Sequence, residues 1–203
     1  YYYRNKMEFS YSSNKWIVDA NNSIENSSPA FGLHVKKRFD KIVDISNCHI
    51  QGKKSDEIFN FIKKYLLEYK IASFNMKTKS GYLKNVIIRE GQETNQILIN
   101  FITTNDDTSI LSKLTNLLKE NFNEVKGIIN TIVKPNSGSS ISDKEIILWG
   151  QDYIEEKIGE YTPHFIFNDV SVLDLVSRGN SSQVSIPEEK SRVMHQLLTK
   201  AFE

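Results

Sequence analysis

The middle of this 203-residue chain carries two consecutive strand patterns joined by a turn. Residues 83–89 and 96–103 are rich in Ile, Leu, Val and Phe, and residues 91–95 between them read Gly-Gln-Glu-Thr-Asn. β-Branched and aromatic runs that are bounded by turn-forming residues predict a β-hairpin. A hairpin is stable in water only when other elements bury its apolar faces. The flanking segments therefore decide the fold class.

Helical patterns flank this hairpin on both sides. Residues 56–69 and 109–121 repeat apolar side chains at the spacing of an amphipathic helix. Ser55 stands where it could cap the first helix, and Asp56 and Glu57 suit the positive end of the helix dipole. The apolar stripes are Ile58, Phe59, Ile62, Leu66 and Tyr69 in the first helix, and Ile110, Leu114, Leu117 and Leu118 in the second.

Further strands are expected on either side of this central region. Their alternating or β-branched patterns cover residues 6–11, 30–35, 41–45, 126–133, 145–149 and 161–167, with 16–18 as a possible hairpin partner of the first. The order of elements predicts an α+β fold, in which two helices cover one face of a largely antiparallel sheet. The amino-terminal strands would extend or flank that sheet.

Three segments follow from this pattern. Residues 1–54 form a basic, β-rich segment, residues 55–168 form the central α+β domain, and residues 169–203 form a carboxy-terminal helical extension. Pro187 is expected to begin the helix of that extension, because proline is favoured in the first helical turn.

Composition places the chain among ordinary soluble globular proteins, with 39% hydrophobic and 25% charged residues. No apolar stretch approaches the roughly 20 residues that a membrane-spanning helix needs. Cys48 is the single cysteine, which excludes an internal disulfide framework and fits a reducing compartment. We therefore expect a cytoplasmic protein.

Positive charge is concentrated in the amino-terminal quarter of the chain. Residues 1–54 hold nine Lys and Arg against five Asp and Glu, whereas the remaining residues hold 17 against 20. Lys36, Lys37 and Arg38 stand in an expected turn, and Arg4 and Lys6 lie beside three tyrosines. Such cations bind phosphate oxygens, and tyrosine faces can stack on unpaired bases. The alternative is a solvated basic face with tyrosines that pack against a neighbouring segment.

Several segments resemble the RNA (uracil-5-)-methyltransferase family. They are Tyr-Arg-Asn-Lys-Met-Glu-Phe at 3–9, Phe-Gly-Leu-His at 31–34, Arg-Phe-Asp-Lys-Ile-Val-Asp-Ile at 38–45, and Cys48. Residues 83–89 and 150–156 continue the resemblance, which covers residues 1 to about 165. Members that modify bacterial 23S ribosomal RNA are the most similar, and transfer-RNA-modifying relatives share the pattern less fully.

The resemblance implies that the chain is the central, RNA-binding and domain-linking part of an S-adenosylmethionine-dependent enzyme. Structured RNA is the implied partner, ribosomal rather than transfer RNA, with Arg4, Lys6, Lys36, Lys37 and Arg38 as its contacts. In iron–sulfur-containing members the cysteine at the position of Cys48 is the last of four cluster ligands. Several relatives lack the cluster, so Cys48 could equally be a buried thiol.

The catalytic half of the family has no counterpart in these residues. Methylation at carbon 5 of uridine uses a nucleophilic cysteine, a carboxylate base and a glycine-rich cofactor loop. Cys48 lies in the wrong segment to be that nucleophile. The chain alone is therefore expected to be inactive, although its parent protein would be an enzyme.

A second hypothesis is a non-catalytic protein-interaction module. The carboxy-terminal helix would then present Val193, Leu197 and Leu198 to a partner chain instead of its own core. Oligomerisation that depends on Leu197 would favour this reading.

Overall fold

The computed structural model describes residues 2–13, 15, 29–75, 77–135, 144–157 and 164–166, with only the backbone described at 39–40 and 164–166. All of them belong to one compact unit, Tyr1–Phe167. The strand expected at 16–18 and the helix expected from Pro187 lie outside the described residues.

Seven strands form a single sheet in the order β3-β2-β1-β4-β5-β6-β7. Every neighbouring pair is antiparallel except β5 and β6, which run parallel. This confirms the largely antiparallel sheet that the sequence predicts. The strands are β1 (Lys6–Ser12), β2 (Ala30–Val35), β3 (Arg38–Asp44), β4 (Leu83–Glu90), β5 (Ile97–Thr103), β6 (Val125–Ile132) and β7 (Lys144–Gly150).

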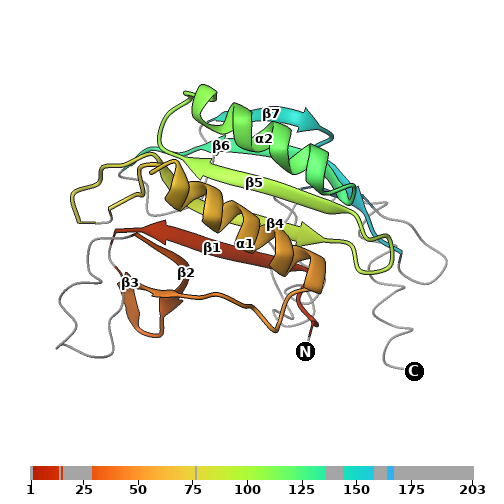
Figure 1. Cartoon of the computed structure of the whole chain (residues 1–203), viewed down its shortest axis with the longest axis horizontal. Coiled ribbons are helices and arrows are strands. Elements are labelled where there is room, and N and C mark those ends of the chain that lie inside the picture. The colour runs from red at the N-terminus through yellow and green to blue at the C-terminus, as the bar shows by residue number, and fades with distance from the viewer. Residues whose placement is uncertain are drawn as a thin grey trace, which may run out of the picture. The chain divides into compact units, whose positions relative to one another are not determined.

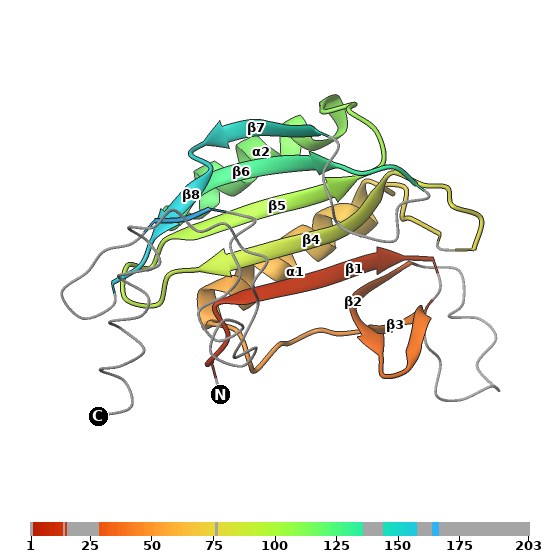
Figure 2. The same cartoon turned by 180° about the vertical axis from the view of Figure 1, so that it is seen from behind.

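Two helices, α1 (Lys53–Glu68) and α2 (Ser109–Asn121), cover the same face of this sheet (Figures 1 and 2). Helix α2 forms the crossover that parallel strands β5 and β6 require. A separate two-stranded sheet, β8 (Tyr153–Glu155) with β9 (His164–Ile166), follows β7. Of the strand expected over residues 161–167, the described residues 164–166 form β9, which pairs with a strand that the sequence pattern did not reveal.

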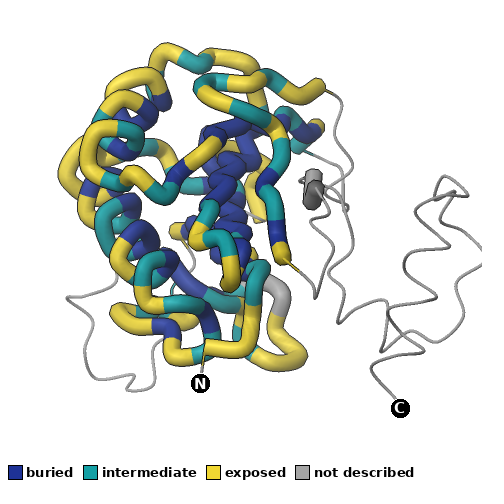
Figure 3. Tube along the Cα trace, turned by 90° about the vertical axis from the view of Figure 1, so that its right-hand side faces the viewer, coloured by how far each residue is buried: buried dark blue, intermediate teal, exposed yellow. Residues whose placement is uncertain are grey.

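The main core lies between the helices and the sheet. Phe9 of β1, Phe31 of β2 and Phe59 of α1 are fully buried there. The ring centroids of Phe31 and Phe59 lie 4.7 Å apart and those of Phe9 and Phe59 lie 4.4 Å apart. In Figure 3 the buried stretches lie inside the fold and the exposed stretches on its outer surface. Because three elements meet at one aromatic cluster, the amino-terminal strands share the core of the central region.

The opposite face of the sheet is also apolar along its central strands. Ile87, Leu98, Ile102 and Ile129 alternate with core residues of the helical face and are themselves buried. Ile154 of β8 packs with this second cluster. The small sheet thus begins on the face that the helices leave uncovered.

Helix α1 begins differently from the expectation. Its N-cap residue is Gly52, and no side chain caps it. Ser55, which the sequence pattern suggested as the cap, is buried inside the first turn and donates a hydrogen bond to Glu90 of β4. A Cβ atom on Gly52 would lie 2.2 Å from a Glu90 carboxylate oxygen. The prediction was wrong because a carboxylate from a distant strand occupies the positive end of this helix.

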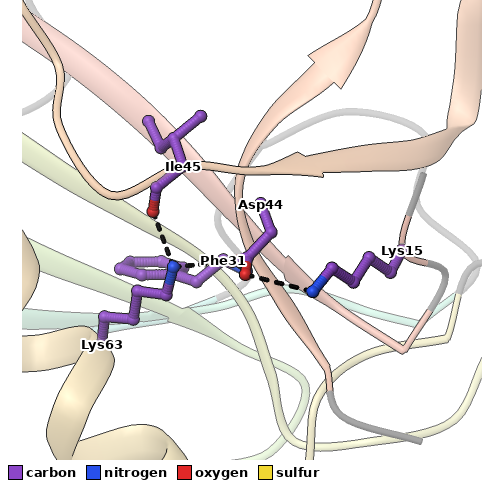
Figure 4. Close-up of polar contacts among 5 residues, drawn as sticks. All are labelled: Lys15, Phe31, Asp44, Ile45 and Lys63. Carbon is purple, nitrogen blue, oxygen red and sulfur yellow. Dashed lines mark hydrogen bonds and ion pairs between the residues drawn. The ribbon is translucent and has the colours of Figure 1, made fainter. Parts of the chain in front are cut away.

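A carboxylate also fastens α1 to the edge of the sheet (Figure 4). Asp44, at the end of β3, accepts a hydrogen bond from the Phe31 backbone N–H at 3.1 Å and pairs with the Lys63 ammonium at 2.8 Å. Lys63 also donates to the Ile45 carbonyl oxygen at 2.6 Å. The Lys15 ammonium lies 3.5 Å from the second Asp44 oxygen. Lys63 therefore bridges the helix to β3 and to the loop that follows it.

Replacing Asp44 with Ala should lower the free energy of unfolding by about 2 kcal/mol, because two cations and a backbone N–H lose a charged acceptor in a partly buried site. Urea unfolding measures the change. Glu57→Ala is the matched control, since it removes a carboxylate from an exposed pair with Lys54, and it should leave stability almost unchanged. Equal losses for both variants would contradict the assigned role of Asp44.

Tyr11 makes folding stability depend on pH. Its hydroxyl donates to the Ile71 carbonyl oxygen at 3.1 Å, and burial raises its pKa to about 12. A tyrosine in the unfolded chain has a pKa of about 10. The stabilisation that Tyr11 contributes is therefore complete below about pH 10 and is lost as the pH rises through the folded pKa.

Between about pH 10 and 12 we therefore expect the free energy of unfolding to fall, with Tyr11 contributing up to ~1.4 kcal/mol per pH unit. Tyr11→Phe should make the fall shallower, as urea unfolding at stepped pH would show. Tyr3→Phe, at an exposed position, serves as the control. A Tyr11→Phe profile parallel to that of the wild type would refute the assignment.

Candidate nucleic-acid interface

The turn between β2 and β3 carries the first group of predicted RNA contacts. Lys36 and Lys37 form the turn itself, and Arg38 begins β3 opposite Val35. Lys37 adopts a left-handed backbone conformation with φ of 64°, which closes the turn after a bulge at His34 and Val35. All three cationic side chains are exposed. We call Lys36, Lys37 and Arg38 the hairpin cations.

Arg4 and Lys6, the other predicted contacts, lie at the start of β1. Arg4 is exposed, and its backbone N–H donates to the Ile50 carbonyl oxygen at 2.8 Å. Lys6 is half-buried and pairs with Arg89 of β4 in the sheet. Figures 1 and 2 show the β2–β3 turn well separated from this end of β1 in both views. The predicted cations thus occupy two surfaces instead of one.

The structure adds further residues beside Arg4. The Tyr2 backbone N–H donates to the His49 carbonyl oxygen at 3.0 Å, and Arg4 forms an isolated parallel β-bridge with Gln51. Residues 2–4 therefore run parallel to residues 49–51. The Lys53 ammonium, at the start of α1, lies 5.8 Å from the centroid of the Tyr2 ring. Tyr2, Tyr3, Arg4, His49 and Lys53 are all exposed. We call these five residues the amino-terminal patch.

The sequence pattern indicated the tyrosines and Arg4 of this patch, but it gave no sign that His49 and Lys53 lie beside them. About 45 residues separate the two halves in the chain. Only the parallel pairing of residues 2–4 with 49–51 brings them together. Nothing in the local pattern of either segment signals that pairing.

Cys48 lies directly beside the patch but points into the protein. It is 6% exposed and belongs to the main core cluster, and its backbone N–H donates to an Asp56 carboxylate oxygen at 2.7 Å. Within the described residues, no group of three or more His, Cys, Asp or Glu side chains could hold a metal ion. These residues therefore do not fit an iron–sulfur cluster by themselves, since a cluster needs about four converging ligands.

A hydrogen-bonded row of polar side chains crosses β1, β2 and β4 on the face opposite the helices. The Ser10 hydroxyl lies 2.9 Å from His34 Nε2 and donates to Asn85 Oδ1 at 3.2 Å. The Asn85 amide in turn donates to the Glu8 carboxylate. Because the four groups satisfy one another across three strands, we assign them a role in holding the strands together.

The β4–β5 turn connects the amino-terminal patch with the segment after β7. The buried Glu156 carboxylate accepts backbone N–H groups from Gln92 at 2.6 Å and from Glu93 at 3.1 Å. The Gln96 side chain and the Glu155 backbone and carboxylate exchange two hydrogen bonds, at 3.0 and 3.2 Å. On the other side, the Gln92 amide donates to the Tyr2 carbonyl oxygen at 3.0 Å. One turn therefore fixes both Tyr2 and residues 155–156.

Removing the Glu156 carboxylate should loosen this turn locally. In Glu156→Ala we expect the amide hydrogens of Gln92 and Glu93 to exchange with solvent about 10-fold faster or more, because each loses a charged acceptor. Hydrogen exchange followed by NMR measures this rate. Lys157→Ala, at the next exposed residue, is the control. Unchanged protection of both amides would show that Glu156 does not hold the turn.

The chain is similar in sequence to curated proteins that are named as RNA methyltransferases. No family model matches it. An uncharacterized RNA methyltransferase of Porphyromonas gingivalis is 29% identical over 77% of this chain and 35% of its own length. One from Clostridium acetobutylicum is 32% identical over 77% of this chain and 33% of its own length. The chain thus spans about a third of the length of the curated relatives it matches.

A solved structure shares the fold. The tRNA (uracil-54, C5)-methyltransferase of Pyrococcus abyssi, in complex with S-adenosyl-L-homocysteine, superimposes with a TM-score of 0.59. The match covers 87% of this chain and 40% of that protein, with 22% sequence identity. At this identity the likeness concerns the arrangement of helices and strands. It supports the α+β architecture described above.

Proposed function

We propose, because the chain belongs to the RNA (uracil-5-)-methyltransferase family, that it is the central part of such an enzyme and holds structured RNA for it. In this role the hairpin cations and Arg4 with Lys6 bind phosphates of the folded RNA. The segment after β7 leads toward the rest of the protein. The chain's own task is binding and orientation, so that a uridine extruded from the RNA can be modified elsewhere in the enzyme.

The observation that carries this proposal is the exposure of the hairpin cations at a tight turn. Lys36, Lys37 and Arg38 are consecutive and all exposed, so their charges lie close together. Like charges that lie close together repel one another in the isolated protein. Phosphate groups of a nucleic acid neutralise them and release counterions. Exposed consecutive cations on a hairpin are therefore better suited to RNA than to an internal structural role.

S-Adenosylmethionine is the proposed methyl donor of the whole enzyme. The Pyrococcus protein of the same fold binds S-adenosyl-L-homocysteine, the product that remains when the methyl group has left. In the described residues we assign no cofactor site and no catalytic residue. Cys48 is buried in the core and is not placed to attack an RNA base. Its role as an iron–sulfur ligand stays a prediction about the parent protein, in which the other ligands would come from outside the described residues.

Ribosomal RNA is the proposed target, on the resemblance of residues 3–9, 31–34 and 38–45 to enzymes that modify 23S RNA. The Pyrococcus enzyme acts on transfer RNA, so transfer RNA is the alternative. No helix among the described residues is both long and apolar enough to cross a membrane. A cytoplasmic location stays a prediction.

Replacing Lys36, Lys37 and Arg38 together with Ala should weaken binding to structured RNA. Each lost phosphate contact lowers the slope of log Kd against log salt by about 1, so we expect a decrease of roughly 2 to 3 for the triple variant. Fluorescence anisotropy with 23S-derived and transfer RNA stem-loops, over a range of KCl concentrations, measures both affinity and slope. Tighter binding of the ribosomal stem-loop is expected.

A matched control removes the same charge from the helical layer. This control variant combines Lys64→Ala in α1, Lys70→Ala two residues beyond the end of α1, and Lys119→Ala in α2. This variant should keep most of the affinity and of the salt slope. If the wild type binds neither RNA at low salt, or if both triple variants lose affinity equally, the RNA-holding role is wrong.

The alternative of a protein-interaction module rests on Val193, Leu197 and Leu198. These residues lie outside the described part of the chain. That alternative therefore stays a prediction, and no feature of the described residues favours it.

A further inference from the structure

The amino-terminal patch exposes two aromatic rings at the surface of the protein. Tyr2 and Tyr3 are 40% and 58% exposed, and they are adjacent in the chain. The other exposed large hydrophobic residues of the described part are Val43, Leu67, Tyr69 and Ile147, which are scattered over β3, α1 and β7. Two neighbouring exposed tyrosines are therefore a local feature of this surface.

The backbone at Tyr2 is held in an unfavourable conformation. Its φ is 60°, a left-handed value that a bulky side chain rarely adopts. Two hydrogen bonds fix it there, from the Tyr2 N–H to the His49 carbonyl oxygen and from the Gln92 amide to the Tyr2 carbonyl oxygen. The conformation does not bury the ring, because the side chain stays exposed. Its consequence is to set the direction of the chain at the two tyrosines.

Positive charge lies beside the Tyr2 ring, and two carboxylates of this region accept hydrogen bonds at the start of α1. The exposed Lys53 ammonium lies 5.8 Å from the centroid of the Tyr2 ring, and the exposed Arg4 follows Tyr3 in the chain. Asp56 accepts the Cys48 backbone N–H, and Glu90 accepts the Ser55 hydroxyl. These two acidic groups are thus directed to the start of α1. The patch presents flat aromatic faces together with positive charge.

We infer that the amino-terminal patch is a stacking site for an unpaired nucleotide of the bound RNA. Tyr3, the more exposed ring, stacks on the base, and Arg4 and Lys53 bind the flanking phosphates. Aromatic faces with adjacent cations fit an unpaired base, because the faces of paired bases are covered by their neighbours in a duplex. An apolar protein partner would gain nothing from the charges of Arg4 and Lys53 beside the rings. This inference rests on the proposed RNA-holding function and names a different surface from the hairpin cations.

The test uses two RNAs that differ only in pairing at one position. One is a stem-loop with 2-aminopurine in its loop, and the other is a duplex with the same 2-aminopurine paired. Tyr3→Ala should raise the Kd for the stem-loop about 5- to 150-fold, the range for losing one stacked base, and should abolish quenching of 2-aminopurine fluorescence. Binding to the duplex should not change. The salt slope should stay at its wild-type value, because no phosphate contact is removed.

Two variants control for the ring and for the backbone. Tyr3→Phe keeps the aromatic face and should bind within about 2-fold of the wild type. Tyr2→Asn removes the neighbouring ring and introduces a residue that tolerates the left-handed conformation. Its affinity therefore reports on the Tyr2 ring and not on a change of the backbone. Thermal unfolding checks that each variant is folded.

The outcomes separate this inference from the proposed function. If the triple variant of the hairpin cations loses affinity but Tyr3→Ala binds the stem-loop as the wild type does, the stacking site is overturned and the RNA-holding role stands. Equal losses on stem-loop and duplex would also overturn it. If the wild type binds neither RNA at low salt, both proposals fall.

Discussion

The aromatic cluster of Phe9, Phe31 and Phe59 is the contact on which the rest of the structure depends. It joins β1 and β2 to α1 through three fully buried side chains, with ring centroids 4.4 to 5.9 Å apart. Removing a buried phenylalanine costs about 3–5 kcal/mol, a large part of the stability of a domain this size. Because α1 is fixed by this cluster, the loop before it and residues 2–4 beside that loop also have a fixed place. Both surfaces proposed to contact RNA are therefore carried by a rigid support.

Several carboxylates of this nearly neutral chain make their hydrogen bonds and ion pairs inside the fold. The chain has a net charge of +1, which gives little general attraction for nucleic acid. Asp44 binds Lys63 and a backbone N–H, Asp56 and Glu90 serve the start of α1, and Glu156 holds the β4–β5 turn. These acidic groups point toward donors inside the protein. The cations of the hairpin and of the amino-terminal patch are exposed.

The two surfaces suit a folded RNA better than a uniform duplex. The β2–β3 turn and the start of β1 are well separated (Figures 1 and 2). The phosphates that contact the two surfaces therefore need not lie in one straight row. The hairpin cations offer charge, whereas the amino-terminal patch combines rings with charge. The β4–β5 turn links that patch to residues 155–156, which lead onward from the sheet. Through it a nucleotide bound at the patch, as proposed, would be linked to residues 155–156.

The sequence by itself determined the local elements. The apolar stripes located α1 and α2, with the bounds of α2 correct at both ends, and alternation located the strands of the sheet. These patterns repeat within a few residues, so each segment contains the information about its own buried face. The consecutive cations of the turn and the family resemblance were also visible in the residues alone.

Only the tertiary structure decided which distant segments meet. It placed β1 beside β4, made β5 and β6 parallel, and set Glu90 in place of Ser55 at the start of α1. It also brought His49 and Lys53 to Tyr2. Such pairings depend on how whole apolar faces fit together across tens of residues, and a local pattern carries no record of its partner. For that reason the sequence supplied the cations and tyrosines, and the fold decided that they form two surfaces.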